Sequence, residues 1–144
     1  MVDLSWVLLV EDDEDHRVLV RQALERLEED VPLLEVESGE EALEWMKRQV
    51  TRVGPLKGGL VIMDLGLPGI SGFEVLQKMR EIPGLEDTPV AVITASENSM
   101  DQDHAFNLGA RGFFQKPTDF REYQEILKRV MGLKPTTHEE PGPT

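Results

Sequence analysis

The feature that most constrains the fold is a set of short apolar runs that stop at chemically reactive side chains. The runs Trp6–Val10 and Gly59–Met63 end at acids, which are Glu11–Asp13 after the first run and Asp64 after the second. A continuous apolar run is typical of a strand buried on both faces of a parallel sheet. The carboxyl ends of parallel strands lie at one edge, where such sheets bind ligands. We therefore expect the acids of both runs to share one pocket.

Two later runs end at other polar groups. Val90–Ile93 is followed by the hydroxyl of Thr94, and Phe113–Gln115 is followed by the ammonium group of Lys116. Helical patterns lie between the runs, so the chain repeats a strand and a helix, which favours parallel pairing. Five such units account for the domain, and the mixed run 32–37 indicates a peripheral strand.

Three of the expected helices carry a start signal, in which a Ser or Asp precedes a Glu by three positions. These pairs are Ser38 with Glu41, Ser71 with Glu74, and Asp119 with Glu122. Apolar spacing predicts a first helix over about 15–28. The glycine-rich stretch 53–59 is expected to be a connecting loop.

Composition limits the classes of function. The 144 residues suit one domain, and a formal net charge of -13 disfavours contact with nucleic acid or an anionic membrane. Cysteine is absent, which excludes a disulfide framework and suits a reducing cytoplasm. The start of the chain has no basic segment before an apolar one, and no run is long enough to span a bilayer. We expect a cytoplasmic protein with a domain over 1–132 and a disordered tail over 133–144.

Four separate motifs occur in a distinctive order. They are the acidic cluster Glu11–Asp13, Asp64 followed along the chain by Pro68 and Gly72, Thr94-Ala95, and Lys116-Pro117. This set resembles the receiver domain of bacterial two-component response regulators, over nearly all of the chain from Trp6 to Met131. The resemblance implies an α/β fold of the flavodoxin-like receiver type. Such a fold is a doubly wound five-stranded parallel sheet, with strand order 2-1-3-4-5 and helices on both faces.

The acidic cluster requires a neutralising cation. Two carboxylates about 4 Å apart repel by roughly 4 kcal/mol at an effective dielectric constant of 20. Mg²⁺ prefers oxygen ligands in octahedral geometry and keeps several waters, so a few protein oxygens suffice. The resemblance implies that Asp12 and Asp64 bind Mg²⁺ directly, that Glu11 acts through a water, and that the main-chain carbonyl of Gly66 completes the protein ligands.

The resemblance also implies the chemistry. Asp64 would be the phosphoacceptor that attacks a phosphohistidine of a sensor histidine kinase, and Lys116 would screen the developing charge. Thr94 would bond the phosphoryl group, with Ala95 as a small neighbour and Phe113 as a ring that turns inward. The bond between Lys116 and Pro117 is expected to be cis, as in the family. The chain would then catalyse only its own phosphorylation and dephosphorylation, and so would not be an enzyme in the usual sense.

The partners are predicted from the same likeness. A chain with no attached output domain would signal by changing the surface around Thr94 and Phe113. The apolar residues of the last helix could support a homodimer. The stretch Lys116–Phe120 and the long connection before Leu60 look like small regulators that partner bacterial phytochromes. That likeness predicts a light-sensing histidine kinase as the phosphodonor.

Two alternatives belong to other classes of function. Mg²⁺-dependent phosphatases also use an aspartate at a strand end, but many carry a second aspartate two residues later, where this chain has Gly66. A receiver-like interaction module that works without phosphorylation stays open. Gly66 and Ser96 offer no acid or amide to hold a water, so we expect self-dephosphorylation to depend mainly on solvent access.

Overall fold

The computed structural model describes residues 5–27 and 30–132, in which five strands alternate with five helices. The strands are β1 (Trp6–Val10), β2 (Leu33–Val36), β3 (Gly59–Met63), β4 (Val90–Thr94) and β5 (Gly112–Gln115). The helices are α1 (Glu14–Arg26), α2 (Gly39–Val53), α3 (Gly72–Glu81), α4 (Ser99–Asn107) and α5 (Phe120–Met131). The predicted disordered tail, 133–144, lies outside the described residues.

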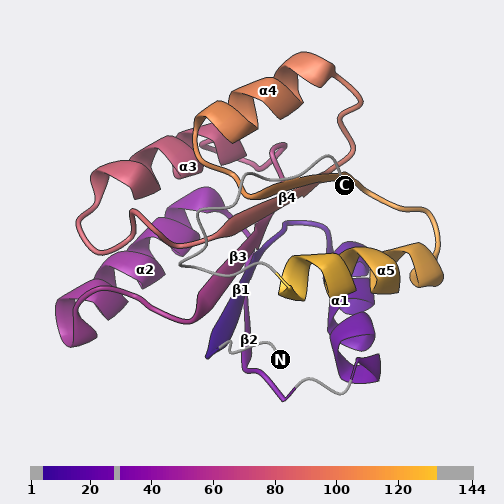
Figure 1. Ribbon diagram of the computed structural model, residues 1–144, viewed down its shortest axis with the longest axis horizontal. Coiled ribbons are helices and arrows are strands. Elements are labelled where there is room, and N and C mark those ends of the chain that lie inside the picture. The colour runs from indigo at the N-terminus through magenta and orange to yellow at the C-terminus, as the bar shows by residue number, and fades with distance from the viewer. Residues whose placement is uncertain (1–4, 28–29, 133–144) are drawn as a thin grey trace.

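All strand pairs are parallel, and the strands lie in the order β2-β1-β3-β4-β5. This arrangement confirms the predicted doubly wound α/β fold and its strand order. β2 lies at an edge, and all its residues are only half-buried, in agreement with the peripheral strand expected over 32–37. Helices α1 and α5 cover one face of the sheet, while α2, α3 and α4 cover the other (Figure 1).

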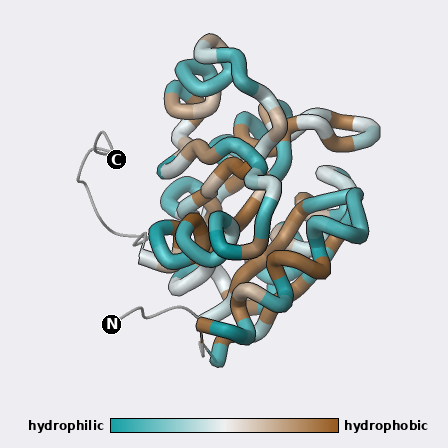
Figure 2. The backbone as a smooth tube through the Cα atoms, turned by 90° about the vertical axis from the view of Figure 1, so that its right-hand side faces the viewer, coloured by the Kyte–Doolittle hydropathy of each residue, from teal (hydrophilic) through white to brown (hydrophobic). Residues whose placement is uncertain are grey.

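Alternation along each strand divides the interior into two cores. In β1, Val7 and Leu9 pack toward α1 and α5, whereas Leu8 and Val10 pack toward the three other helices. This division follows from the two-residue period of a strand, which points successive side chains to opposite faces. Figure 2 shows hydrophobic residues concentrated in the strands at the middle of the molecule. A sheet packed on both sides is a rigid support for the loops at its edges.

The start signals read from the sequence form the expected caps. Ser71 and Glu74 make a complete capping box at the start of α3, and the side chain of Asp119 accepts the backbone N–H of Glu122 at 2.9 Å. The side chain of Ser38 accepts the Glu41 N–H at 3.2 Å.

Helix α1 differs from the span expected over 15–28, because it begins at Glu14 and ends at Arg26. Its N-cap is Asp13, whose carboxylate accepts the N–H of Asp15 at 2.9 Å. Asp caps a free N–H group and starts the helix one residue earlier than apolar spacing indicates. Among the described residues, no helix has both the length and the apolar character needed to cross a membrane.

Candidate functional site

The acids that end β1 and β3 meet at the carboxyl edge of the sheet. Val10 of β1 pairs with Met63 of β3, so the next residues of both strands leave the sheet side by side. Ligand oxygens of Glu11, Asp12 and Asp64 all lie within 4.8 Å of one another. The three acids share one pocket, as expected for the ends of adjacent parallel strands.

Lys116 enters this pocket from the end of β5. Its Nζ lies 2.9 Å from Glu11 Oε1 and 2.9 Å from Asp64 Oδ2. Its backbone N–H donates to the carbonyl oxygen of Thr94 at 2.7 Å, which fixes the chain beside β4. Burial by itself lowers the pKa of Lys116, but the bonds to Asp64 and Glu11 outweigh burial and the pKa is raised. The ammonium group therefore stays charged at neutral pH.

The prediction that the peptide bond between Lys116 and Pro117 is cis is wrong. No peptide bond among the described residues is cis, so this bond is trans. Trans is the lower-energy form of a bond before proline, by about 0.5–1 kcal/mol. The trans backbone already brings the Lys116 ammonium into contact with both carboxylates. The lysine needs no cis bond to reach the pocket.

The three carboxylates are held in different ways. Glu11 is buried, its Oε2 accepts the Asp13 N–H at 3.2 Å, and burial raises its pKa although Lys116 opposes the shift. Asp64 is also buried, and its Oδ1 accepts the Gly66 N–H at 3.2 Å. The carboxylate of Asp12 is exposed and has no hydrogen-bond or ion-pair partner in the part of the chain that the structure describes. An unpaired carboxylate in an all-oxygen donor set fits Mg²⁺.

The loop after Asp64 is shaped by two glycines. A Cβ on Gly72 would lie 2.5 Å from the carbonyl oxygen of Asp64 and 2.8 Å from Leu65 Cα, so only glycine lets α3 start against this loop. By contrast, a Cβ on Gly66 would have no atom within 4 Å. Position 66 therefore has room for a side chain. The metal-binding role of the Gly66 carbonyl stays a prediction.

The residues expected to switch lie on β4 and β5. Thr94 ends β4, is buried, and its Oγ1 accepts the Ser96 N–H at 3.4 Å. Ala95 follows it and is exposed. Phe113 pairs with Val92 and is half-buried against the core on the side of α2, α3 and α4. These positions connect the acidic edge to α4 and β5, and their switching roles stay predictions.

Residues beside the pocket have contacts that the sequence analysis did not predict. The Nδ1 of His16 lies 2.8 Å from the hydroxyl oxygen of Tyr123. Tyr123 is buried, and burial raises its pKa, with smaller contributions from the charges of Glu11, Asp64 and Asp13. The sequence signal that could have predicted this contact is Tyr123 itself, because a buried tyrosine in an apolar helix face needs a hydrogen-bond partner for its hydroxyl.

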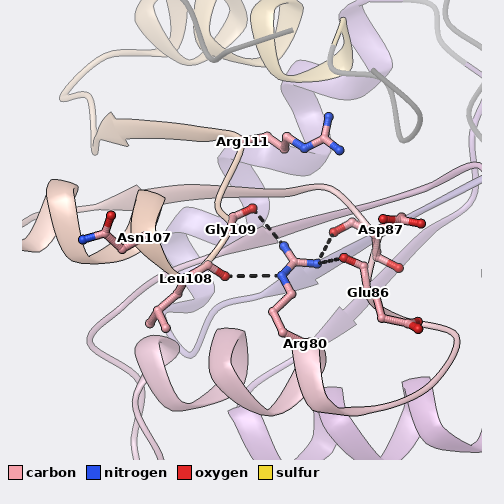
Figure 3. A pocket seen from close by; sticks show the side chains of 8 residues that line it. Arg80, Glu86, Asp87, Asn107, Leu108, Gly109 and Arg111 are labelled. Atoms are coloured by element: carbon pink, nitrogen blue, oxygen red, sulfur yellow. Dashed lines mark hydrogen bonds between the residues drawn. The ribbon is translucent and has the colours of Figure 1, made fainter. Parts of the chain in front are cut away.

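A second cavity, of about 340 Å³, opens near the amino ends of β4 and β5 and is lined in part by Arg80, Asp87 and Arg111. Figure 3 shows the guanidinium of Arg80 pointing at backbone carbonyls of the surrounding loops. It donates to the carbonyl oxygens of Leu85, Glu86, Thr88, Leu108 and Gly109. Its donors are directed at the protein itself, so we interpret this cavity as a structural joint between α3, α4 and the loop before β4.

Comparison with known proteins places the chain among signalling proteins. The family model for the response regulator receiver domain matches residues 7–128. The response regulator Rcp1 of Synechocystis sp. is 29% identical over 128 residues, which cover 89% of this chain and 85% of Rcp1.

Solved structures agree with the sequence comparison. The phosphorylated cyanobacterial phytochrome response regulator RcpA is similar with a TM-score of 0.79 and 25% identity, over 96% of this chain and 99% of RcpA. The Mn²⁺-bound form of Rcp1 gives a TM-score of 0.78 and 27% identity, over 90% and 97% of the two chains. The bacteriophytochrome response regulator RtBRR gives 0.74 and 30%, over 97% and 85%.

Proposed function

The chain belongs to the response regulator receiver family, and from this premise we propose that it accepts a phosphoryl group on Asp64 from a sensor histidine kinase. The observation that carries the proposal is the convergence of Asp64, Glu11, Asp12 and Lys116 from three strand ends on one pocket. A buried aspartate beside an ammonium group has the surroundings of an activated nucleophile.

The transfer step is an in-line displacement at phosphorus. A carboxylate oxygen of Asp64 forms the new O–P bond while the N–P bond of the phosphohistidine breaks, and the imidazole leaves with the electron pair and is protonated. Lys116 lies against the Asp64 carboxylate and stabilises the negative charge on the transferred group. Later attack by water releases phosphate, so the chain acts only on its own phosphoryl group.

Asp12, Asp64 and Glu11 are the side chains that would hold Mg²⁺, and the carbonyl of Gly66 is proposed as a further ligand. A bound divalent ion supplies positive charge for the phosphoryl oxygens and offsets the repulsion among the acids. Two features support this assignment. The carboxylate of Asp12 has no partner in the described chain, and the similar protein Rcp1 has a Mn²⁺-bound structure.

The output is proposed to be a change of the surface around Thr94 and Phe113. The Ser96 N–H donates to Thr94 Oγ1 at 3.4 Å, and the Ser96 hydroxyl donates to Asp101 of α4 at 2.6 Å. If the Thr94 hydroxyl turns to a phosphoryl oxygen, with Ala95 leaving room for the group, it gives up the Ser96 bond. This path supports α4 as the element that responds.

The apolar residues of the last helix cannot form the interface of the expected homodimer. Tyr123, Leu127 and Val130 are buried against α1 and the sheet within one chain. The face of α5 left for a second copy is charged and includes Lys128, 3.4 Å from Glu125. We therefore propose a homodimer only if its interface is formed by that polar face of α5 and the neighbouring surface.

A bacterial phytochrome is the proposed kinase partner, because RcpA and RtBRR are named as phytochrome response regulators. With such a kinase as its partner the chain would work in the cytoplasm, and a sequence without cysteine supports this proposal.

The test is phosphotransfer from two radiolabelled kinases, one a bacterial phytochrome and one a kinase with another input domain. We expect label on the wild-type chain, faster from the phytochrome, and none on Asp64→Asn. Equal rates from both kinases would remove the phytochrome assignment. Label on Asp64→Asn would remove the assignment of the acceptor.

A further inference from the structure

We propose that Arg17 is a positioning residue for the metal pocket, which it serves by orienting the peptide plane that carries Asp12. The inference rests on the proposed function, because it assumes that the acidic pocket binds a divalent cation. Arg17 itself contacts none of the three carboxylates of that pocket in the described structure. Its effect on the metal would therefore be indirect.

Arg17 is fixed at two points. Its Nη1 donates to the carbonyl oxygen of Glu11 at 2.9 Å, and its Nε lies 3.6 Å from Oε1 of Glu35 on β2. The side chain is 13% exposed, so the guanidinium is mostly enclosed by these neighbours. A planar fork held on two sides has little freedom to turn. The Glu11 carbonyl is accordingly held in one direction.

The held carbonyl determines where Asp12 points. The C=O of Glu11 and the N–H of Asp12 belong to one planar peptide unit, so fixing the oxygen fixes the plane on which Asp12 begins. The N–H of Glu11 also donates to the carbonyl oxygen of Val36, at 3.0 Å, which anchors the preceding peptide to β2. No side-chain partner holds the Asp12 carboxylate in the described chain, so its direction depends on this backbone.

The support continues to the surface of the molecule. Arg21 binds Glu35 through two bonds, from Nε to Oε2 at 2.9 Å and from Nη2 to Oε1 at 2.8 Å. Arg21 is 45% exposed and, in the described part of the chain, makes no hydrogen bond to the loop that carries the acids. It has the same charge as Arg17 and the same carboxylate partner, but lacks the bond to Glu11. Arg21 is therefore a matched control.

Charge alone predicts the opposite result. Arg17 is a cation close to a site for another cation, so by Coulomb's law its removal should tighten Mg²⁺ binding. A positioning role predicts weaker binding, because Asp12 would lose its fixed direction. The sign of the change in Kd therefore separates the two explanations.

The experiment titrates Mg²⁺ into the unphosphorylated chain and follows calorimetric heat and the amide shifts of Asp12 and Asp64. Residues that orient metal ligands typically change metal affinity by 10–100-fold, and we expect Arg17→Gln to raise the Kd by about 10-fold. Arg21→Gln should bind as the wild type does. Arg17→Lys, which keeps the charge but cannot bridge Glu11 and Glu35, should also bind more weakly.

The outcomes are separable. An unchanged or lower Kd for Arg17→Gln overturns the inference while leaving the metal site intact. If Arg17→Gln does not fold, as judged by circular dichroism, Arg17→Lys decides, and wild-type affinity in that variant overturns the inference. A wild-type chain that shows no Mg²⁺ binding removes the metal site itself, and with it the proposed function.

Discussion

At the scale of single residues, the pocket holds more negative than positive charge. Glu11, Asp12 and Asp64 face one ammonium group, that of Lys116. Burial raises the pKa of Glu11, so its ionised form is costly in this position. Lys116 compensates part of this cost, and a divalent cation would compensate the remainder. The excess negative charge of the site therefore favours the binding of a divalent metal ion.

The hydrogen bond between His16 and Tyr123 joins α1 to α5 next to the pocket. We expect Tyr123→Phe to lower the free energy of unfolding by about 1 kcal/mol, the usual net value of one hydrogen bond. His16→Gln should have a similar effect. Because both changes remove the same bond, the double variant should cost less than the sum of the single ones.

Urea denaturation of the wild type, both single variants and the double variant measures this coupling. Phe120→Leu is a suitable control, because Phe120 belongs to the same helix but is only partly buried, and its ring lies against Arg26 rather than His16. Additive effects of His16→Gln and Tyr123→Phe would mean that the bond contributes nothing to stability.

Sequence reasoning at this scale succeeded where strand pairing determines the contact. The acids at the ends of β1 and β3 could be predicted to meet, because parallel strands bring their ends to one edge. The contacts of His16 with Tyr123 and of Arg17 with Glu35 could not be predicted, because no pairing pattern in the sequence determines which side chains of a helix meet other elements. The cis bond before Pro117 was carried over from the family, and no residue in this sequence requires it.

At the scale of elements, α4 is the least firmly held helix. Ala105 is its only buried residue among those described, and Met100 is 74% exposed. Two polar and aromatic side-chain contacts add to the packing of Ala105. The Ser96 hydroxyl donates to Asp101 at 2.6 Å, and the ring of His104 stacks on Phe73 with centroids 4.4 Å apart. Few buried contacts favour local opening, which suits an element that changes during signalling.

Loss of the Asp101 carboxylate should loosen α4. In Asp101→Ala the helix loses its bond to Ser96, and a loss of about 1 kcal/mol corresponds to roughly fivefold faster amide exchange. Hydrogen exchange with mass spectrometry measures the effect on peptides over 99–107. Asp103→Ala, which removes an exposed acid of the same helix, should leave exchange unchanged. Equal exchange in both variants would show that the Ser96 bond does not anchor α4.

Helix and strand types were predictable because their signals are repetitive. Apolar runs marked the strands, and the residues Ser71 and Asp119 marked helix starts that the structure confirms. The start of α1 was less predictable, because nothing in the sequence distinguishes Asp13, which caps that helix, from the other acids of the cluster. A cap and a solvated acid have the same residue type, and only the local backbone distinguishes them.

At the scale of the whole molecule, the packed sheet provides the support, and the loops at its carboxyl edge carry the reactive residues. Two cores pack its faces, and the acidic pocket lies in the loops at its carboxyl edge. The loops can therefore rearrange around a ligand while the sheet stays in place. Ligand binding at such an edge should stabilise the entire folded domain, because the three acids come together only when the strands are assembled.

Mg²⁺ should consequently raise the free energy of unfolding. A ligand that binds only the folded state at 100 times its Kd adds about 2.7 kcal/mol. Urea denaturation with and without Mg²⁺ measures this increment, with a Mg²⁺-free buffer of matched ionic strength as the reference. Asp12→Asn should lose most of the increment, whereas Asp13→Asn, which changes an acid outside the metal cluster, should keep it. An increment that survives Asp12→Asn would place the bound cation elsewhere.

The most direct test of the central claim is intact-mass analysis after incubation with acetyl phosphate and Mg²⁺. The account predicts one added phosphoryl group on the wild type and on Asp13→Asn, none on Asp64→Asn, and none on the wild type when Mg²⁺ is chelated. A phosphoryl group on Asp64→Asn, or none on the wild type with Mg²⁺ present, would contradict Asp64 as the acceptor in this pocket.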